Sequence, residues 1–275
     1  MISVLTNTTS MLAQNNLSKS SNALSDNLSR LSSGLRVRSA ADDAAGLAIS
    51  EDFKAKIRGL GQAKRNANDG VSLAQTADGA LKEIGGMLGR MRELAVQSAT
   101  GTINTTQRTY LDDEFGQLKS EIDRLATTTE FNGINLLNGA SSTSPVDFQV
   151  GTGNSADDRL TLTIATATTS ALAVNDNGVS TADKALSSIS ALDAAISAVS
   201  SRRGTIGSMS NRLSVTISNL STYATNLSAA NSRVVDVDIA SETAKLTKNQ
   251  ILTQAGAAML AQANQAPQIA LSLLG

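Results

Sequence analysis

The spacing of apolar residues predicts one long helix between Ile189 and Val234. Every seventh residue from Leu192 onward is apolar, and a second column, three residues earlier in each repeat, is apolar at most of its positions. Alternating steps of three and four residues are typical of a helix that packs in a coiled-coil manner. Because one apolar stripe does not stabilise an isolated helix in water, we expect the rest of the chain to supply partner helices.

Two partner helices are predicted in the first half of the chain. Apolar residues at helical spacing extend from about 43 to 99 and again from about 106 to 127. Ser39 with Asp42, and Ser180 with Asp183, have the spacing of capping boxes, so we expect helices to begin after each pair. These segments predict a long antiparallel helical bundle.

The two ends of the chain carry a sparser pattern. Residues 1–35 hold only three charged side chains, and no charged residue follows Asn249. Serine, threonine and asparagine fill much of the first segment and are weak helix formers, so we expect it to be marginal or disordered alone. Glutamine and asparagine interrupt the apolar positions of the last segment, which favours a crowded core shared between subunits. We assign six leucines to this assembly seam: Leu17, Leu24, Leu28, Leu31, Leu246 and Leu260.

A short β region interrupts the helices at about 140–180. Val146, Phe148 and Val150 alternate with polar residues, as do Leu160, Leu162 and Ile164, and a glycine-containing loop separates the two runs. This pattern predicts a β-hairpin. The fold class expected from the whole chain is mostly α, with a coiled-coil-like bundle and one small hairpin region.

Composition excludes several classes of function. The 275 residues include no histidine and no cysteine, and the net charge is -1. The commonest general base and the commonest metal ligand, both supplied by histidine, are therefore missing, so we expect no enzyme, no metal and no cofactor. A nucleic-acid partner is not expected without a basic excess. The first residues lack a signal-peptide pattern, and no apolar run is long enough to predict membrane insertion. We interpret Asp42-Asp43 and Asp112-Asp113 as charges at helix starts rather than catalytic pairs.

Several longer motifs occur in a fixed order near the two ends of the chain. They are Asn27-Leu-Ser-Arg30-Leu-Ser-Ser-Gly34-Leu-Arg36, Ala41-Asp-Asp43-Ala-Ala-Gly46-Leu-Ala-Ile, Arg65-Asn-Ala-Asn68-Asp-Gly70, Arg92-Glu-Leu94-Ala-Val96-Gln97, Glu130-Phe-Asn132-Gly, Ser232-Arg-Val-Val-Asp236-Val-Asp238 and Leu271-Ser-Leu-Leu274. With these motifs the chain closely resembles bacterial flagellin over about 1–140 and 180–275.

The resemblance implies a subunit of the flagellar filament that serves swimming motility. It implies that 1–42 and 236–275 pair as a separate coiled coil in an inner tube and fold on assembly. It assigns 43–235 to the helical bundle of the next shell, with the hairpin at about 140–180. The outer domains of larger flagellins have no room in this chain. The expected partners are further copies of the chain, an export chaperone at the C-terminus, and the cap and hook-junction proteins, with secretion through the flagellar type III apparatus.

Four residues match positions through which flagellins contact the innate immune receptor TLR5 or pack against each other. They are Arg90, Arg92, Leu94 and Glu114. We expect this face to pack between subunits first and to be recognised by the receptor as a secondary use. The Arg202-Arg203 pair interrupts the apolar column of the long helix, and we expect it to form ion pairs between subunits.

Three other functions share parts of this pattern. A hook–filament junction protein has similar terminal segments, but the runs at Arg92–Gln97 and Glu130–Gly133 favour flagellin. A flagellin with a metalloprotease insert would need an insert and a His-Glu-x-x-His site, which the sequence lacks. A coiled-coil scaffold or adhesin would remain soluble and would not polymerise.

Overall fold

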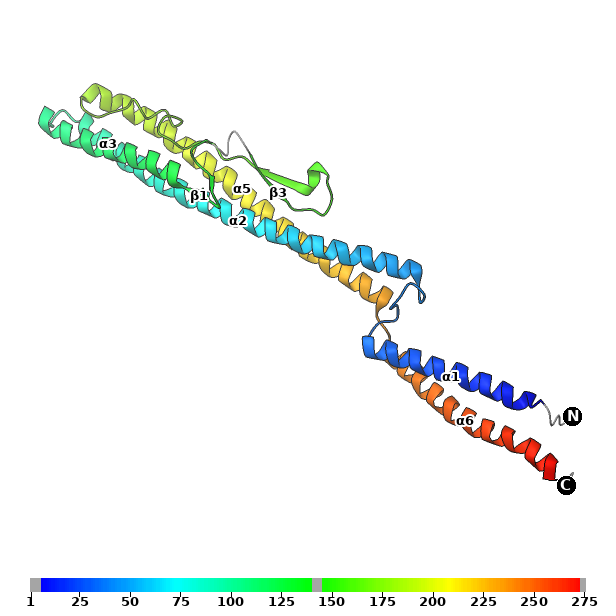
Figure 1. The fold of residues 1–275 in the computed structure, drawn as a ribbon. Coiled ribbons are helices and arrows are strands. Elements are labelled where there is room, and N and C mark those ends of the chain that lie inside the picture. The colour runs from blue at the N-terminus through cyan, green and yellow to red at the C-terminus, as the bar shows by residue number, and fades with distance from the viewer. Residues whose placement is uncertain (1–5, 140–144, 273–275) are drawn as a thin grey trace. The chain divides into compact units, whose positions relative to one another are not determined.

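The computed structural model describes residues 6–139 and 145–272 (Figure 1). Five α-helices dominate the described residues: α1 (Thr8–Ser33), α2 (Ala44–Ala99), α3 (Thr105–Thr128), α5 (Ala182–Val235) and α6 (Ile239–Ser272). The chain divides into two compact units, one made of residues 1–55 with 226–275 and the other of residues 56–225. The mostly helical bundle predicted by the apolar spacing is confirmed. In the part of the chain that the structure describes, no helix is both long enough and apolar enough to cross a membrane.

The larger unit is held together by a thin apolar core between α2, α3 and α5. Phe115 of α3, Leu88 of α2 and Leu192 of α5 have no exposed surface. The apolar column of α5 stays buried from Leu192 to Leu227, as its spacing predicts. At its end Val235 is buried instead of Val234, because a 3.6-residue helix drifts from a strict seven-residue repeat.

The starts of the long helices differ by a residue or more from the predicted caps. Ser39 and Asp42 do interact, through a hydroxyl-to-carboxylate hydrogen bond of 3.3 Å, but α2 begins after Asp43, whose carboxylate accepts from the Gly46 amide at 2.9 Å. Likewise the Thr181 hydroxyl accepts from the Lys184 amide at the start of α5. In each case a neighbouring side chain lies closer to the free amides of the first helical turn.

The predicted hairpin is present and packs on the bundle. Strands β3 (Val146–Gln149) and β4 (Arg159–Leu162) pair antiparallel, with Phe148 opposite Leu160, and a 3-10 turn, η1 (Ala156–Asp158), lies in the loop between them. The Asn66 amide of α2 donates to the Gln149 carbonyl oxygen at 2.9 Å. The Phe148 ring packs beside Gly70 of α2, where an added Cβ would stand 3.2 Å from the ring.

A second, shorter hairpin was not predicted. Strands β1 (Glu130–Phe131) and β2 (Ile134–Asn135) pair antiparallel around Asn132 and Gly133, which both have positive φ. The Asn-Gly pair is the favoured sequence for this two-residue turn. Of the β region expected at 140–180, residues 140–144 lie outside the described residues.

One face of α3 holds the irregular segment before α5 in place. The Asp123 carboxylate accepts from both the amide and the hydroxyl of Thr169, at 2.8 and 2.7 Å. The Asp112 carboxylate accepts from the Val179 amide at 2.6 Å, and Lys119 donates to two carbonyl oxygens between them. Asp112 therefore has a structural role. It lies well past the first turn of α3, whose start is capped by Asn104 and Gln107, so the interpretation of Asp112-Asp113 as charges at a helix start is wrong.

The smaller unit pairs α1 with α6. The two helices run antiparallel, and the chain segments that lead into them are joined by a bridge between Leu35 and Asp236. Gly34 ends α1 in the left-handed conformation, and its carbonyl oxygen accepts from the Val237 amide at 3.0 Å. Glycine adopts this conformation without the steric cost that a Cβ would bring.

Candidate assembly surface

The two terminal helices meet along a heptad seam. On α1 the residues turned toward α6 step by three and four, and on α6 the residues turned toward α1 do the same. The α1 set is Ser10, Ala13, Leu17, Ser20, Leu24, Asn27 and Leu31, and the α6 set is Glu242, Leu246, Asn249, Thr253, Gly256, Leu260 and Ala263. Five of the six predicted leucines lie in this seam. The sixth, Leu28, is 51% exposed and lies outside it.

Large residues of one helix face small residues of the other. An added Cβ at Gly256 would stand 3.3 Å from the Leu17 side chain, so the leucine fills the space left by the glycine. At the far end, the Asn7 amide donates to the Ala263 carbonyl oxygen at 2.8 Å and the Ser10 hydroxyl donates to the Asn264 side chain at 2.7 Å. The seam thus buries few large apolar side chains, and its stabilisation from apolar burial is modest.

Two buried polar side chains of the seam escaped the sequence analysis. Asn27 is 7% exposed, and in the amide orientation that satisfies both its atoms it donates to the Ala23 carbonyl and accepts from the Leu246 amide. Glu242 is 3% exposed; one carboxylate oxygen pairs with Lys245 at 3.2 Å, and the other has no hydrogen-bond partner among the described residues. Neither residue is apolar, so only their positions in the heptad repeat indicate that they are buried.

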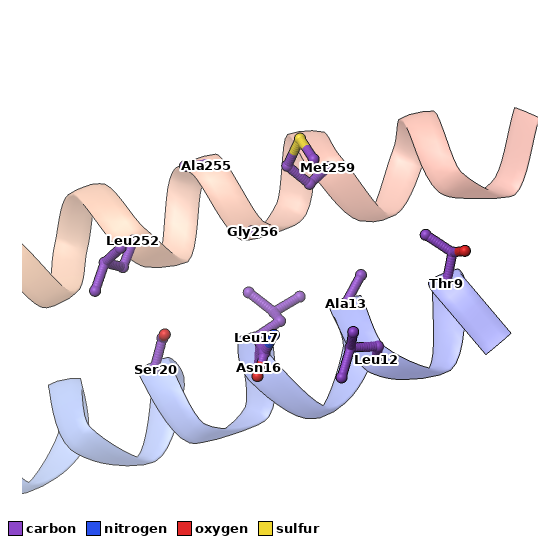
Figure 2. A pocket seen from close by; sticks show the side chains of 10 residues that line it. All are labelled: Thr9, Leu12, Ala13, Asn16, Leu17, Ser20, Leu252, Ala255, Gly256 and Met259. Carbon is purple, nitrogen blue, oxygen red and sulfur yellow. The ribbon is translucent and has the colours of Figure 1, made fainter.

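An open groove runs along one side of the seam (Figure 2). Leu12 and Leu17 of α1 and Leu252 and Met259 of α6 line it, with Gly256 at its floor. Its volume is about 340 Å³ and most of its wall is apolar. Leu12, Leu252 and Met259 are 64%, 44% and 66% exposed. Apolar side chains gathered in an open groove with no charged lining residue are typical of a surface for association.

An ion-pair cluster holds the segment between α1 and α2. The Asp42 carboxylate accepts from the amides of Arg38 and Ser39 and lies 3.4 and 3.5 Å from the guanidinium groups of Arg30 and Arg38. The hydrogen bond from the Arg38 amide, with these neighbours, lowers the pKa of Asp42 from 3.8 to about 2. Asp42 therefore fixes this link as an anion at neutral pH.

The four residues assigned to receptor recognition do not form one exposed face. Arg90 of α2 pairs with Glu114 of α3 at 2.9 Å, and Arg92 pairs with Asp193 of α5 at 2.6 Å. These hydrogen bonds raise the pKa of both arginines above its ordinary value. Leu94 has no exposed surface and belongs to the core, because it lies on the side of α2 that faces the bundle. Leu94 is therefore not available to a receptor in the folded bundle.

Arg203 finds its partner within the chain. Its guanidinium contacts the carboxylate of Asp78 on α2, at 2.7 and 3.3 Å, so the expectation of a pair between subunits is wrong for this residue. Asp78 occupies the matching level of the neighbouring helix, which the apolar spacing alone did not indicate. Its neighbour Arg202 is half-buried, and burial lowers the pKa of its guanidinium.

Ionisable side chains do not gather in the groove. Among the residues that the structure describes, no three histidine, cysteine, aspartate or glutamate side chains come together as metal ligands do. The groove itself is lined by no ionisable side chain. Its chemistry suits the packing of helices.

Comparison with known proteins agrees with this architecture. The N-terminal helical region of bacterial flagellin matches residues 4–142, and the C-terminal helical region matches residues 189–274. The flagellar filament 33 kDa core protein of Treponema phagedenis is 42% identical over 280 residues, and the flagellin of Halalkalibacterium halodurans is 46% identical over 268; each alignment covers 98% of both chains.

A solved structure supports the same assignment. The crystal structure of Bacillus cereus flagellin is 37% identical, with a TM-score of 0.51 over 61% of this chain and 94% of that chain. The two terminal regions that the sequence motifs indicated are thus the regions that the family shares. The chain belongs to the bacterial flagellins, and it is a structural subunit of the flagellar filament.

Proposed function

We propose that the α1–α6 pair is the assembly surface of this flagellin and that its groove receives a neighbouring subunit. One observation carries the proposal: the groove exposes Leu12, Leu252 and Met259, and none of the residues that line it carries a charge that would repel an identical copy. Burying such side chains is worth about 1.5–3 kcal/mol each, which is favourable only when another molecule covers them.

The weak seam explains how folding and assembly are coupled. The pair contains small and polar residues at most of its contact positions, so its intrinsic stability is low. The cost of ordering both helices is met when a neighbour adds apolar contacts, which restricts filament growth to sites where neighbours are present. We assign residues 1–42 and 236–275 to this inner tube and 43–235 to the surrounding shell of helices.

The same surface accounts for the accessory partners. An export chaperone would cover the uncharged C-terminal segment before secretion to the extracellular flagellum. Cap and hook-junction proteins would meet the α1–α6 pair at the ends of the filament. These partners share one requirement, a complementary apolar helical face.

A secondary role as a TLR5 ligand rests on fewer residues than the sequence indicated. Arg90, Arg92 and Glu114 are between 42% and 49% exposed, so their polar ends are accessible to the receptor. Monomer carrying Arg90→Ala should signal less than wild type in a TLR5 reporter assay, with an unchanged circular dichroism spectrum. Equal signalling by the two proteins would remove Arg90 from the receptor contact.

A charge placed in the groove tests the assembly surface. Leu252→Lys should leave the monomer helical, because Leu252 is 44% exposed, but should abolish growth on filament seeds. Thr247→Lys is the matched control, since it adds the same charge to an exposed part of α6 that already carries Lys245 and Lys248. Normal filament growth by the Leu252→Lys protein would rule out the groove as the assembly surface.

A further inference from the structure

The methionines of this flagellin fall into two groups by exposure. Met259 and Met11 are 66% and 63% exposed, whereas Met91 and Met209 are 0% and 6% exposed in the core of the larger unit, and Met87 packs partly buried against that core. Methionine is otherwise a residue of apolar interiors, and an exposed thioether reacts with peroxides far more readily than a buried one. The chain has no cysteine to react first.

Of the methionines that the structure describes, Met259 alone combines exposure with a place in the groove. Met259 is among the α6 residues that line the groove, with Ala13 and Leu17 on α1 across from it (Figure 2), whereas Met11 does not line the groove. The wall of the groove is mostly apolar, and no charged side chain lines it. Its polar members are Thr9, Asn16 and Ser20. A polar oxygen added to the Met259 sulfur would therefore place a hydrogen-bond acceptor in the lining of the mostly apolar groove.

We propose that Met259 is a peroxide-sensitive modification site whose oxidation to the sulfoxide blocks filament assembly; this rests on the proposed role of the groove. The Met259 sulfur attacks one oxygen of hydrogen peroxide and forms an S–O bond while the O–O bond breaks. The other oxygen leaves as water after proton transfer. The sulfur loses two electrons and the peroxide gains them, so one peroxide is consumed for each sulfoxide.

The consequence for assembly follows from the polarity of the sulfoxide. Its oxygen is a strong hydrogen-bond acceptor, and enclosing it without a donor carries the penalty of a buried unsatisfied polar group. We expect the concentration needed for filament growth to rise by about tenfold to a hundredfold. Because methionine sulfoxide is reducible by methionine sulfoxide reductases, the block is reversible.

Exposure also changes with assembly. In the free subunit the Met259 sulfur is open to solvent, whereas a neighbouring copy in the groove would cover it. Newly secreted monomers would then be sensitive to peroxide, and subunits already in the filament would be protected. Oxidation of Met259 would therefore act on subunits before assembly and not on the finished filament.

The test treats full-length monomer with hydrogen peroxide, maps sulfoxides by peptide mass spectrometry and measures growth on filament seeds. Met259 and Met11 should be oxidised well before Met91 and Met209, and growth should be lost while the circular dichroism spectrum is unchanged. Met259→Leu should grow at the same rate before and after peroxide, whatever its rate relative to wild type, although its Met11 is oxidised. Met11→Leu, the matched control, should still lose growth, and both methionine sulfoxide reductases together should restore it.

Two results would overturn the inference. One is oxidation of Met259 at the same rate as the buried Met91. The other is undiminished growth of protein whose Met259 is fully oxidised. The Leu252→Lys protein distinguishes this outcome from a failure of the proposed assembly surface. If Leu252→Lys also grows on filament seeds, the groove is not an interface. If Leu252→Lys does not grow, only the role of Met259 oxidation is refuted.

Discussion

Replacing Gly70 with alanine probes how closely the β3–β4 hairpin packs on the helical bundle. A Cβ at this position would stand 3.1 Å from the Leu213 side chain of α5 and 3.2 Å from two ring atoms of Phe148. Carbon atoms pack comfortably at about 3.5–4.0 Å, so both neighbours would have to shift by several tenths of an ångström. Phe148 is only 8% exposed and pairs within the hairpin, which limits its freedom to move.

Two opposing effects set the magnitude. Alanine in a helix interior is more favourable than glycine by about 1 kcal/mol, whereas overpacking a close-packed site costs about 1–3 kcal/mol. Gly70→Ala should therefore range from neutral to about 2 kcal/mol destabilising. Gly86→Ala in the same helix is the matched control, because nothing lies within 4 Å of its added Cβ, and it should stabilise by about 1 kcal/mol.

Urea unfolding of the two variants, followed by far-UV circular dichroism, measures the difference directly. The urea midpoint of Gly86→Ala should lie above that of wild type. The free energy of unfolding of Gly70→Ala should be about 1–3 kcal/mol lower than that of Gly86→Ala, and its dependence on urea concentration should have the same slope in both variants. If Gly70→Ala is as stable as Gly86→Ala, the hairpin does not press against α2 as described, and the packing argument fails.

Three further predictions follow from individual side chains. Leu94→Ala should lower the stability of the bundle by about 2–5 kcal/mol in urea unfolding, whereas Arg90→Ala should cost less than about 1 kcal/mol; a Leu94→Ala protein as stable as wild type would place that residue on the surface after all. The ionised Asp42 carboxylate stabilises the fold at pH values above 3.8, its pKa in the unfolded chain, and this stabilisation is lost as the pH falls toward about 2, its pKa in the folded protein. Wild type should therefore be more stable than Asp42→Asn at pH 5, and the difference should close by pH 2. A difference in stability that does not depend on pH would contradict this. Asp123→Ala should speed amide hydrogen exchange of Thr169 by about tenfold, and unchanged protection would show that α3 does not hold the segment.

The helices and the hairpin could be predicted because their signals are local. Steps of three and four residues, and alternation over 146–150 and 160–164, report which face of an element is buried without any knowledge of its partner. The caps were missed by a residue or more because several side chains of suitable chemistry stand next to each other at Asp42-Asp43 and at 180–183. The pair β1–β2 has two residues per strand, which is too short for any alternation to show.

The candidate site was harder to predict because its contacts depend on small residues. Gly256 is important for the space it leaves to Leu17, and an apolar pattern does not reveal an absent side chain. Met259 fits an apolar pattern whether it faces a partner or solvent. Leu94 was assigned to the receptor-recognition face because its motif resembles that of flagellins. Only the packing of α2 in the bundle shows that Leu94 faces the core while Arg90 does not.

A cryo-EM reconstruction of filaments grown from this protein, at a resolution that shows side chains, tests the central claim most directly. We predict that α1 and α6 pair in the inner shell and that side chains of a neighbouring subunit fill the groove lined by Leu12, Leu17, Leu252 and Met259. A filament in which this groove stays open, with the neighbours packed against other faces of the two helices, would contradict the account.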